Sequence, residues 1–532
     1  MTNQISPKDL RSWLLDDDEL SLLDVREEGV FGADGHLLFA VCLPMSRLEL
    51  DILSVVPRKS VRLVLCDGGD GLADRAAAKL SDWGYTDVLV LVGGVPGWEE
   101  AGNVVFRGVN VPSKAFGEFV EIESDTPNVS AEELKAMIDG GENMVVLDSR
   151  PWVEYRRMNI PTGIDCPGAE LAYRVHDIVD DPDRTVVVNC AGRTRSIIGA
   201  QSLINAGVPN KVMALRNGTM GWALAGFDLE TGSDRNFLPV SDDGLKDALA
   251  CAERVSKRFG IQTADRATLE SWQTETDAKS LYLLDVRNPD EYAVGHLPGS
   301  LSAPGGQLVQ ATDKWAGTYR SRLVLIDDTG VRATMTASWL VQMGWSNVFV
   351  LKDGLEDTAL ESGAQQAPIV PVANSAIEMI SSCDLNTAIK TDSVTVVDLA
   401  TSLEYKAAHI SGAWWAVRSR LANSLSEVSG DGPLVCTSPD GILAAYAASD
   451  IAELTDRPVR VLDGGTTAWQ AAGLPVAQGF ENMADQNNDI QYKAYDHDDN
   501  IEFHMQEYLS WETGLVEQVA RDGTARFKHF PV

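Results

Sequence analysis

Basic residues are scarce in this chain of 532 residues, where 44 lysines and arginines stand against 78 aspartates and glutamates, a formal net charge of −34. Nucleic acids and anionic membranes are bound through basic surfaces, so the composition predicts neither as a partner. An anionic substrate would have to be attracted by a local cluster of positive charge.

Long apolar runs are missing too, and the first twenty residues lack the basic and apolar regions of a signal peptide. We therefore expect a cytoplasmic protein. Cysteines number only seven, and no two form a Cys-x-x-Cys pair, which argues against a zinc site and against a disulfide framework. No metal ion or other cofactor is predicted.

What the chain does contain is a fourfold internal repeat. In each unit an apolar run ends in an aspartate, at Asp24, Asp148, Asp285 and Asp398. A second apolar run ends 42 positions later in the first three units and 38 positions later in the fourth, at Cys66, Cys190, Asp327 and Cys436. An amphipathic helical segment follows, and then a third apolar run that ends in glycine.

The alternation of strand and helix patterns predicts an α/β fold, with four tandem domains that each have a small parallel sheet flanked by helices. We place these domains at residues 1–112, 118–235, 256–368 and 374–480. Polar or Gly/Pro-containing stretches separate them. Residues 481–532 are predicted to form an acidic linker and a C-terminal helix that could dock back onto a domain.

The units resemble the rhodanese family of sulfurtransferases, and the resemblance extends to about residue 478. It is carried by "LDVRNPDEYAVGHLPGS" (residues 284–300), by the cysteine loop after the second strand, and by "LRNGTMGWALAG" around Trp222. The resemblance implies four rhodanese-like domains, each with a five-stranded parallel sheet. It also implies transfer of sulfane sulfur through a cysteine persulfide, with active and inactive copies in tandem.

Cys190 is the predicted catalytic nucleophile. A thiolate can be stabilised by successive backbone amides in a loop, by the N-terminus of the following helix and by nearby cations. The loop offers all three, with Arg193 and Arg195 as partners for an anionic donor and Ser196 as the expected cap of the helix. The predicted substrate-binding residues are Ala191, Gly192, Arg193, Thr194, Arg195 and Ser196.

The other three units look less suited to the chemistry. Cys66 is followed by Asp67 and Asp70, whose charges disfavour a thiolate, and Cys436 has no arginine in its loop. Both remain secondary candidate nucleophiles. Asp327 cannot carry a persulfide, so the third domain is predicted to be inactive. The first, third and fourth domains are candidates for binding protein partners.

Residues around the loop also admit chemical interpretations. Asp148 and Arg150 are predicted to form a structural ion pair near the site, because the same pair recurs in the inactive third unit. The turn histidine of the other units is replaced by Asn159, which argues against a required general base. Cys166 could resolve a persulfide on Cys190, although a structural role is favoured.

Three functions remain open. The leading prediction is a sulfurtransferase that moves sulfur from a small anionic donor, such as thiosulfate or 3-mercaptopyruvate, to cyanide, a thiol or a protein thiol. The second is a non-catalytic or sulfur-relay module that binds proteins. The third, a cysteine-based phosphatase or arsenate reductase, is disfavoured because Ser196 stands where a Cys-x5-Arg loop needs arginine.

Overall fold

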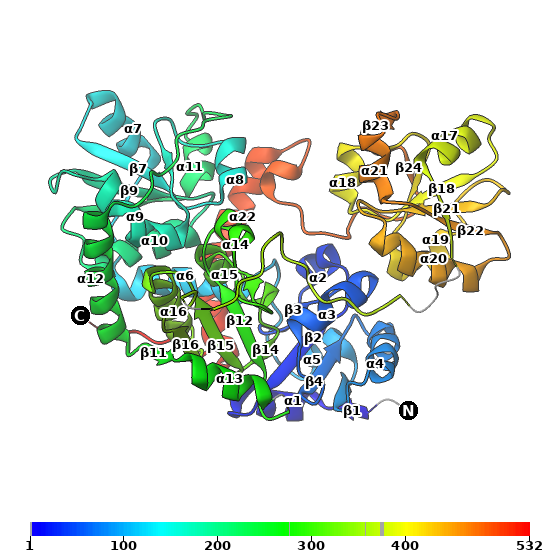
Figure 1. Ribbon diagram of the computed structural model, residues 1–532, viewed down its shortest axis with the longest axis horizontal. Coiled ribbons are helices and arrows are strands. Elements are labelled where there is room, and N and C mark those ends of the chain that lie inside the picture. Colours follow the sequence, from blue (N-terminus) through cyan, green and yellow to red (C-terminus); the bar gives the residue numbers. More distant parts are fainter. Residues whose placement is uncertain (1–2, 276, 357, 373–376, 532) are drawn as a thin grey trace.

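A computed structural model describes residues 3–275, 277–356, 358–372 and 377–531. Four α/β domains follow one another along the chain, each built on its own sheet, and we number them domains 1 to 4 (Figure 1). The predicted α/β class and the tandem arrangement of four units are therefore confirmed.

Domain 2 has a five-stranded parallel sheet in the order β6-β10-β9-β7-β8. Its strands β7 and β9 are apolar except at their ends, because helices cover both faces of the sheet. The strands are β6 (Asn128–Val129), β7 (Met144–Asp148), β8 (Ile164–Asp165), β9 (Thr185–Asn189) and β10 (Val212–Leu215). The helices are α7 (Ala131–Gly140), α8 (Trp152–Arg157), α9 (Leu171–Ile178), α10 (Thr194–Ala206) and α11 (Gly218–Leu224).

Domain 3 repeats this sheet as β11-β16-β15-β12-β13. The strands are β11 (Gln262–Ala264), β12 (Leu281–Asp285), β13 (Leu301–Ser302), β15 (Arg322–Ile326) and β16 (Val348–Leu351). The helices are α13 (Arg266–Thr274), α14 (Pro289–Val294), α15 (Gly305–Gln310) and α16 (Val331–Gln342).

The sheet of domain 1 has six strands, one of which comes from domain 3. Strand β14 (Thr318–Tyr319) pairs antiparallel with β2, and the hydroxyl oxygens of Ser21 and Thr318 are 2.8 Å apart. The domain's own strands are β1 (Asn3–Ile5), β2 (Leu20–Asp24), β3 (Val41–Cys42), β4 (Arg62–Cys66) and β5 (Val88–Leu91). Its helices are α1 (Pro7–Leu15), α2 (Glu28–Asp34), α3 (Leu48–Val55), α4 (Leu72–Asp82) and α5 (Gly94–Glu100).

Domain 4 has a sheet of six strands in the order β17-β22-β21-β18-β20-β24 and a separate pair, β19-β23. The six are β17 (Glu378–Ile380), β18 (Thr395–Asp398), β20 (Trp414–Trp415), β21 (Leu434–Thr437), β22 (Val459–Leu462) and β24 (Asn482–Met483), and the pair is β19 (His409–Ile410) with β23 (Val476–Ala477). The helices are α17 (Ser382–Lys390), α18 (Ser402–Ala407), α19 (Leu421–Ser424), α20 (Ile442–Leu454) and α21 (Gly465–Ala471).

Two of the stretches expected as linkers contain helices. Helix α6 (Val111–Ser124) joins domains 1 and 2, and α12 (Asp242–Phe259) joins domains 2 and 3. Helix α12 buries Cys251, Val255 and Phe259 against the core of domain 2. Their polar faces made these segments look like linkers, whereas their apolar faces hold neighbouring domains together.

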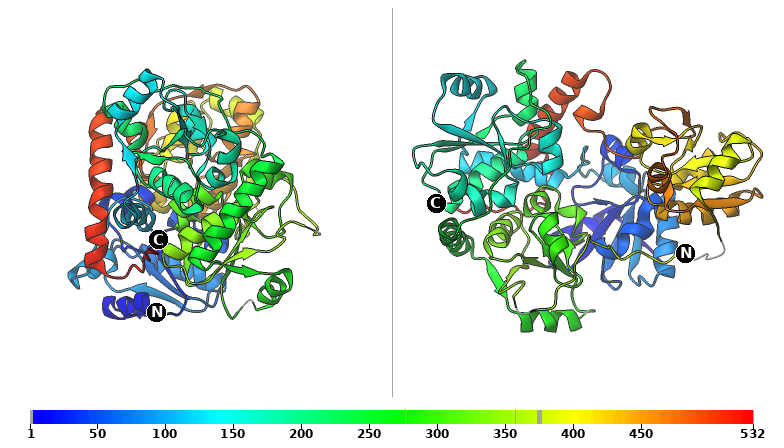
Figure 2. Two further views of the ribbon diagram at one scale, coloured as in Figure 1. Left: turned by 90° about the vertical axis from the view of Figure 1, so that its left-hand side faces the viewer. Right: turned by 45° about the horizontal axis from the view of Figure 1, so that its top comes forward.

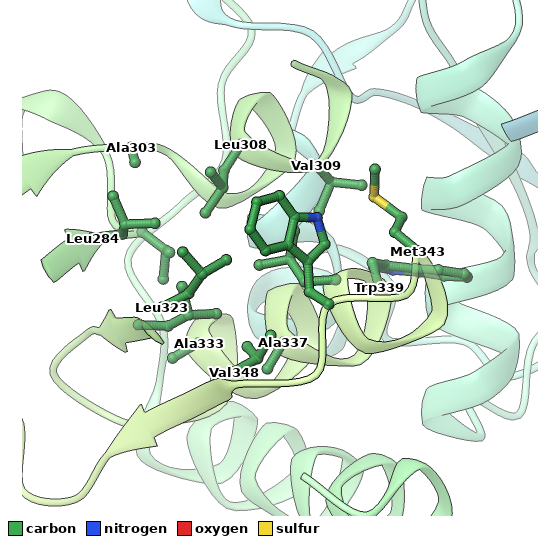
Figure 3. Close-up of a cluster of buried hydrophobic side chains, with 14 of the residues drawn as sticks. Leu284, Ala303, Leu308, Val309, Leu323, Ala333, Ala337, Trp339, Met343 and Val348 are labelled. Atoms are coloured by element: carbon green, nitrogen blue, oxygen red, sulfur yellow. The ribbon is translucent and has the colours of Figure 1, made fainter. Parts of the chain in front are cut away.

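A large apolar cluster fixes domain 3 against α6 and α10. Trp339 of α16 belongs to this cluster, and its ring nitrogen donates a hydrogen bond to Ser202 of α10 at 2.8 Å. Figure 3 shows part of the cluster, in which Trp339 lies beside Met343. Helix α10, which follows the cysteine loop, is thus held by two domains.

After domain 4 the chain returns to domains 1 and 2 through η5 (Ala494–Asp496) and the long helix α22 (Ile501–Asp522). Figure 2 shows this red helix along one flank of the molecule. Trp511 and Gln518 donate hydrogen bonds to the carbonyl oxygens of Arg107 and Val105. The predicted docking of the C-terminal helix therefore occurs. In the described parts of the chain, every helix is too short or too polar to span a bilayer.

Candidate active site

Cys190 lies at the carboxyl end of β9, in a short loop that leads into α10. Its carbonyl oxygen accepts a hydrogen bond from the amide of Thr219 at 2.8 Å. Gly218 comes so close to this loop that a Cβ atom there would lie 2.3 Å from the same oxygen, and its φ of 53° also favours glycine. The segment around Trp222 thus packs directly against the cysteine loop through Gly218 and Thr219.

Strand pairing identifies the residue equivalent to Cys190 in the other domains. Asp148 pairs with Asn189, the residue before Cys190, whereas Asp24 pairs with Cys66 itself. In domain 3 the aspartate pairs with Ile326, and in domain 4 it pairs with Thr437. The positions equivalent to Cys190 are therefore Asp67, Asp327 and Ser438.

Cys66 and Cys436 are thus not in the loops where we expected them. Each lies within its strand, one or two residues before the loop position, and each is fully buried. Burial, with the Asp24 carboxylate, raises the pKa of the Cys66 thiol, and burial raises the pKa of Cys436 to about 12. Neither thiol is placed or ionised as a nucleophile should be.

The loops of domains 1 and 3 bind a carboxylate with their backbone amides. Asp67 accepts hydrogen bonds from the amides of Gly69 and Ala73, both at 2.9 Å. Asp327 accepts them from Gly330 and Arg332 at 2.6 and 2.9 Å. In domains 1 and 3 the loop that follows this strand is therefore an anion-binding frame, and domain 2 has a thiol at the equivalent position.

Both loop arginines are already paired with carboxylates. Arg193 donates two hydrogen bonds to Glu118 at 2.7 and 2.8 Å and also contacts Glu121. Arg195 donates to Glu154 at 2.8 and 3.1 Å. Burial opposes ionisation of Glu154, but Arg195 outweighs it and lowers the pKa of this carboxyl to about 2. The positive charge that we expected Arg193 and Arg195 to bring to the loop is thus largely offset by these carboxylates.

The segment after domain 4 covers the loop, and Cys190 is only 2% exposed. Tyr495 approaches Thr219, with 3.1 Å between their hydroxyl oxygens. Tyr508 packs on Gly192, where a Cβ atom would lie 3.0 Å from its ring. Met505 and Leu509 of α22 pack with Met220 of α11, next to the loop. The periodicity of the sequence predicted this helix but did not indicate which surface it would contact.

Comparison with known proteins agrees with this architecture. The Rhodanese-like domain family matches residues 6–101, 130–225, 266–361 and 382–472, which together are more than half of the chain. The chain belongs to the rhodanese family.

Among solved structures, a crystal structure of a thiosulfate sulfurtransferase from Pseudomonas aeruginosa is similar over the whole chain. It is 48% identical, with a TM-score of 0.96, and the match covers 99% of this chain and 100% of that one. The four rhodanese domains and the C-terminal segment thus share one arrangement in both proteins.

Curated relatives match single parts of the chain. A thiosulfate sulfurtransferase from Pseudoalteromonas translucida is 31% identical over 81 residues, 15% of this chain and 77% of that protein. An HTH-type transcriptional regulator from Mycobacterium tuberculosis is 33% identical over 136 residues, 25% of this chain and 59% of the regulator. A tRNA uridine(34) hydroxylase from Erwinia tasmaniensis is matched over only 28% of its length.

The other residues of domain 2 that the sequence singled out make contacts within the folded domain. Arg150 donates to Asp148 at 2.7 and 2.8 Å, and Asn189 donates to the same carboxylate. Cys166 is fully buried among apolar side chains, and all seven cysteines are free thiols. Ser196 does not cap α10, because the helix starts at Thr194 and the Ser196 hydroxyl donates back to the carbonyl of Arg193.

The histidines of the turn motif are packing residues in the other three rhodanese domains. Each is buried and stacks on an aromatic ring of the preceding helix. The stacked pairs are Phe31–His36, Tyr292–His296 and Tyr405–His409, with ring centroids 3.7–3.8 Å apart. Asn159 of domain 2 occupies the same turn, so its difference from histidine concerns packing rather than acid–base chemistry.

Proposed function

We propose that this protein is a sulfurtransferase that carries sulfane sulfur as a persulfide on Cys190. The observation that supports the proposal best is the comparison of the four loop positions, where Asp67, Cys190, Asp327 and Ser438 are equivalent. Of these four equivalent positions, one holds a thiol. The similarity to thiosulfate sulfurtransferases points to the same chemistry.

With thiosulfate as donor, the Cys190 thiolate attacks the outer, sulfane sulfur. A new bond forms between the two sulfur atoms as the bond from the sulfane sulfur to the sulfonate sulfur breaks. Sulfite leaves with that electron pair, and Cys190 becomes a persulfide anion. An acceptor thiolate, or cyanide, then attacks the outer sulfur of the persulfide and restores the Cys190 thiolate.

We expect backbone amides of the loop to stabilise these anions. The amides that bind Asp67 and Asp327 in domains 1 and 3 belong to residues two, three, five and six positions after the carboxylate. In domain 2 the corresponding amides include those of Gly192 and Arg195, at the N-terminus of α10. They would support both the thiolate and the persulfide.

Domains 1, 3 and 4 serve this site as a frame and offer surfaces for protein partners. Their loops hold a carboxylate or a serine where the nucleophile belongs, which favours a non-catalytic role. Arg332 of domain 3 is fully buried and donates to Glu170 of domain 2 at 2.9 Å, which fixes one domain to the other. A protein thiol is the acceptor class that such surfaces would suit best.

Mass spectrometry of the full-length protein incubated with thiosulfate tests the proposal. The peptide with Cys190 should gain one sulfur atom, and Cys190→Ser should abolish both this gain and thiosulfate:cyanide transfer. Cys66→Ser and Cys436→Ser are the matched controls and should retain both. Sulfur on Cys66 or Cys436, or full transfer by Cys190→Ser, would refute the assignment.

A further inference from the structure

A buried ion pair lies beside the cysteine loop and comes from outside all four domains. Lys114 belongs to α6 and Glu512 to α22, and their side chains are 9% and 0% exposed. The ammonium nitrogen of Lys114 is 3.6 Å from Oε1 of Glu512. Neither residue falls within the spans that match the rhodanese family, so the pair is an addition to the family's fold.

Glu512 touches the loop at two points. The hydroxyl of Thr194 donates a hydrogen bond to its Oε1 atom. Its Oε2 atom would lie 3.4 Å from a Cβ atom on Gly192, two residues after Cys190. This Oε2 atom is buried and has no hydrogen-bond partner among the described residues. Buried polar atoms nearly always have a hydrogen-bond partner, so a fully buried carboxylate with an unpartnered oxygen beside this loop calls for an explanation.

Lys114 also contacts a second residue of α22 that lies against the loop. Its nitrogen lies 5.6 Å from the centre of the Tyr508 ring, and that ring packs on Gly192. The charges of Arg193 and Arg195 are already offset by their own carboxylate partners. Charges in a buried, poorly screened site act strongly on one another, so loss of either member of the Lys114–Glu512 pair would leave one charge uncompensated beside the loop.

We propose that the balance between the charges of Lys114 and Glu512 sets the electrostatic potential at Cys190 and thereby determines how strongly the site prefers anionic over uncharged sulfur donors. The proposal rests on the proposed function, because it concerns the donor of that same site. With both members present, the pair adds no net charge, and the backbone amides bind the anionic group of the donor. An unpaired Lys114 would favour anions, and an unpaired Glu512 would repel them.

The prediction is a change of opposite sign in two variants. Cys190 is alkylated with iodoacetate, an anion, and in parallel with iodoacetamide, its uncharged analogue, and the ratio of the two rates is measured. Both reagents need the same thiolate and the same access past α22, so the ratio reports the potential alone. We expect Glu512→Gln to raise the ratio about fivefold and Lys114→Gln to lower it about fivefold.

Three further variants complete the design. The double variant should return the ratio to the value of the original protein, and Lys114→Arg, which keeps the charge, should leave it unchanged. Glu517→Gln removes the same charge from an exposed position of α22 and should also leave the ratio unchanged. If Lys114→Gln does not fold, the comparison of Glu512→Gln with Glu517→Gln decides.

Ratios that move in the same direction in both single variants, or that equal the ratio of Glu517→Gln, would overturn the proposal and leave the pair a purely structural role. Alkylation requires no sulfur transfer. This test can therefore succeed when no persulfide forms on Cys190, and it can fail when one does, so the two proposals are tested separately. With thiosulfate as donor, the persulfide should form faster in Glu512→Gln and more slowly in Lys114→Gln.

Discussion

Arg418 of domain 4 donates hydrogen bonds to both carboxylate oxygens of Glu49 in domain 1, at 2.7 and 3.0 Å. Both side chains are almost fully buried. The contact between domains 2 and 3 is built alike, with Arg332 donating to Glu170. Each of these two contacts between domains thus contains a buried arginine–glutamate pair.

Arg418→Met should weaken the contact between domains 1 and 4. The substitution leaves Glu49 buried with only Lys79 as a cationic partner, and breaking a buried ion pair destabilises a protein by about 3 kcal/mol or more. Urea unfolding followed by tryptophan fluorescence measures the loss. Arg47→Met removes one member of an exposed pair with Asp51 and should change the stability by less than about 1 kcal/mol. Equal effects of the two substitutions would contradict this account.

Ionisation of the buried Asp165 carboxyl should lower the free energy of unfolding as the pH rises. Burial, together with the Asp148 carboxylate, raises the pKa of Asp165 from 3.8 to about 8. Because the folded protein binds this proton more tightly than the unfolded chain, the stabilisation is complete below about pH 4 and is lost as the pH rises toward 8.

Asp165→Asn should remove this pH dependence, because the amide does not titrate. At pH 8 the variant should be more stable than the original protein by about 2–4 kcal/mol. Urea unfolding at pH 5 and at pH 8 measures the difference. Asp181→Asn, at an exposed site, is the control and should leave the slope between these two pH values unchanged. A slope that persists in Asp165→Asn would exclude this carboxyl as its source.

Asp67→Cys should install a reactive thiol in domain 1. The amides of Gly69 and Ala73 that bind the Asp67 carboxylate would then stabilise a thiolate. In a Cys190→Ser background, we expect the new cysteine to be alkylated by iodoacetamide at neutral pH at least about tenfold faster than its buried neighbour Cys66. Peptide mass spectrometry distinguishes the two sites, and faster alkylation of Cys66 would show that the loop position had been assigned wrongly.

The position of Asp67 also illustrates what the sequence could and could not predict. Apolar periodicity identified the strands, the tandem units and the loop with Cys190. Counting from the aspartate, however, placed Cys66 in the loop, because domain 1 has one more residue than domain 2 between its paired strands. Strand pairing and burial decide the register of neighbouring strands, and counting residues along the chain does not predict that register.

The surroundings of Cys190 were harder to foresee. The sequence alone does not distinguish a loop arginine that binds a substrate from one that pairs with a carboxylate of another helix. Here the carboxylate partner of Arg193 is Glu118, which lies 75 positions earlier in the chain. The apolar face of α22 likewise predicted that the helix is buried without specifying its partner. Contacts between distant segments depend on the packing of whole domains, which periodicity does not encode.

Gly218→Ala should disturb the cysteine loop more than its small size suggests. The added methyl would lie 2.3 Å from the carbonyl oxygen of Cys190, and alanine is disfavoured at a φ of 53°. The loop must then shift away from α11, which removes the hydrogen bond from Thr219. We expect a loss of stability of about 2 kcal/mol and a loss of persulfide formation of at least about tenfold. Gly514→Ala, on α22 with open space around it, should be neutral or slightly stabilising. If Gly218→Ala formed the persulfide at the original rate, the close approach of these two segments would be irrelevant to the reaction.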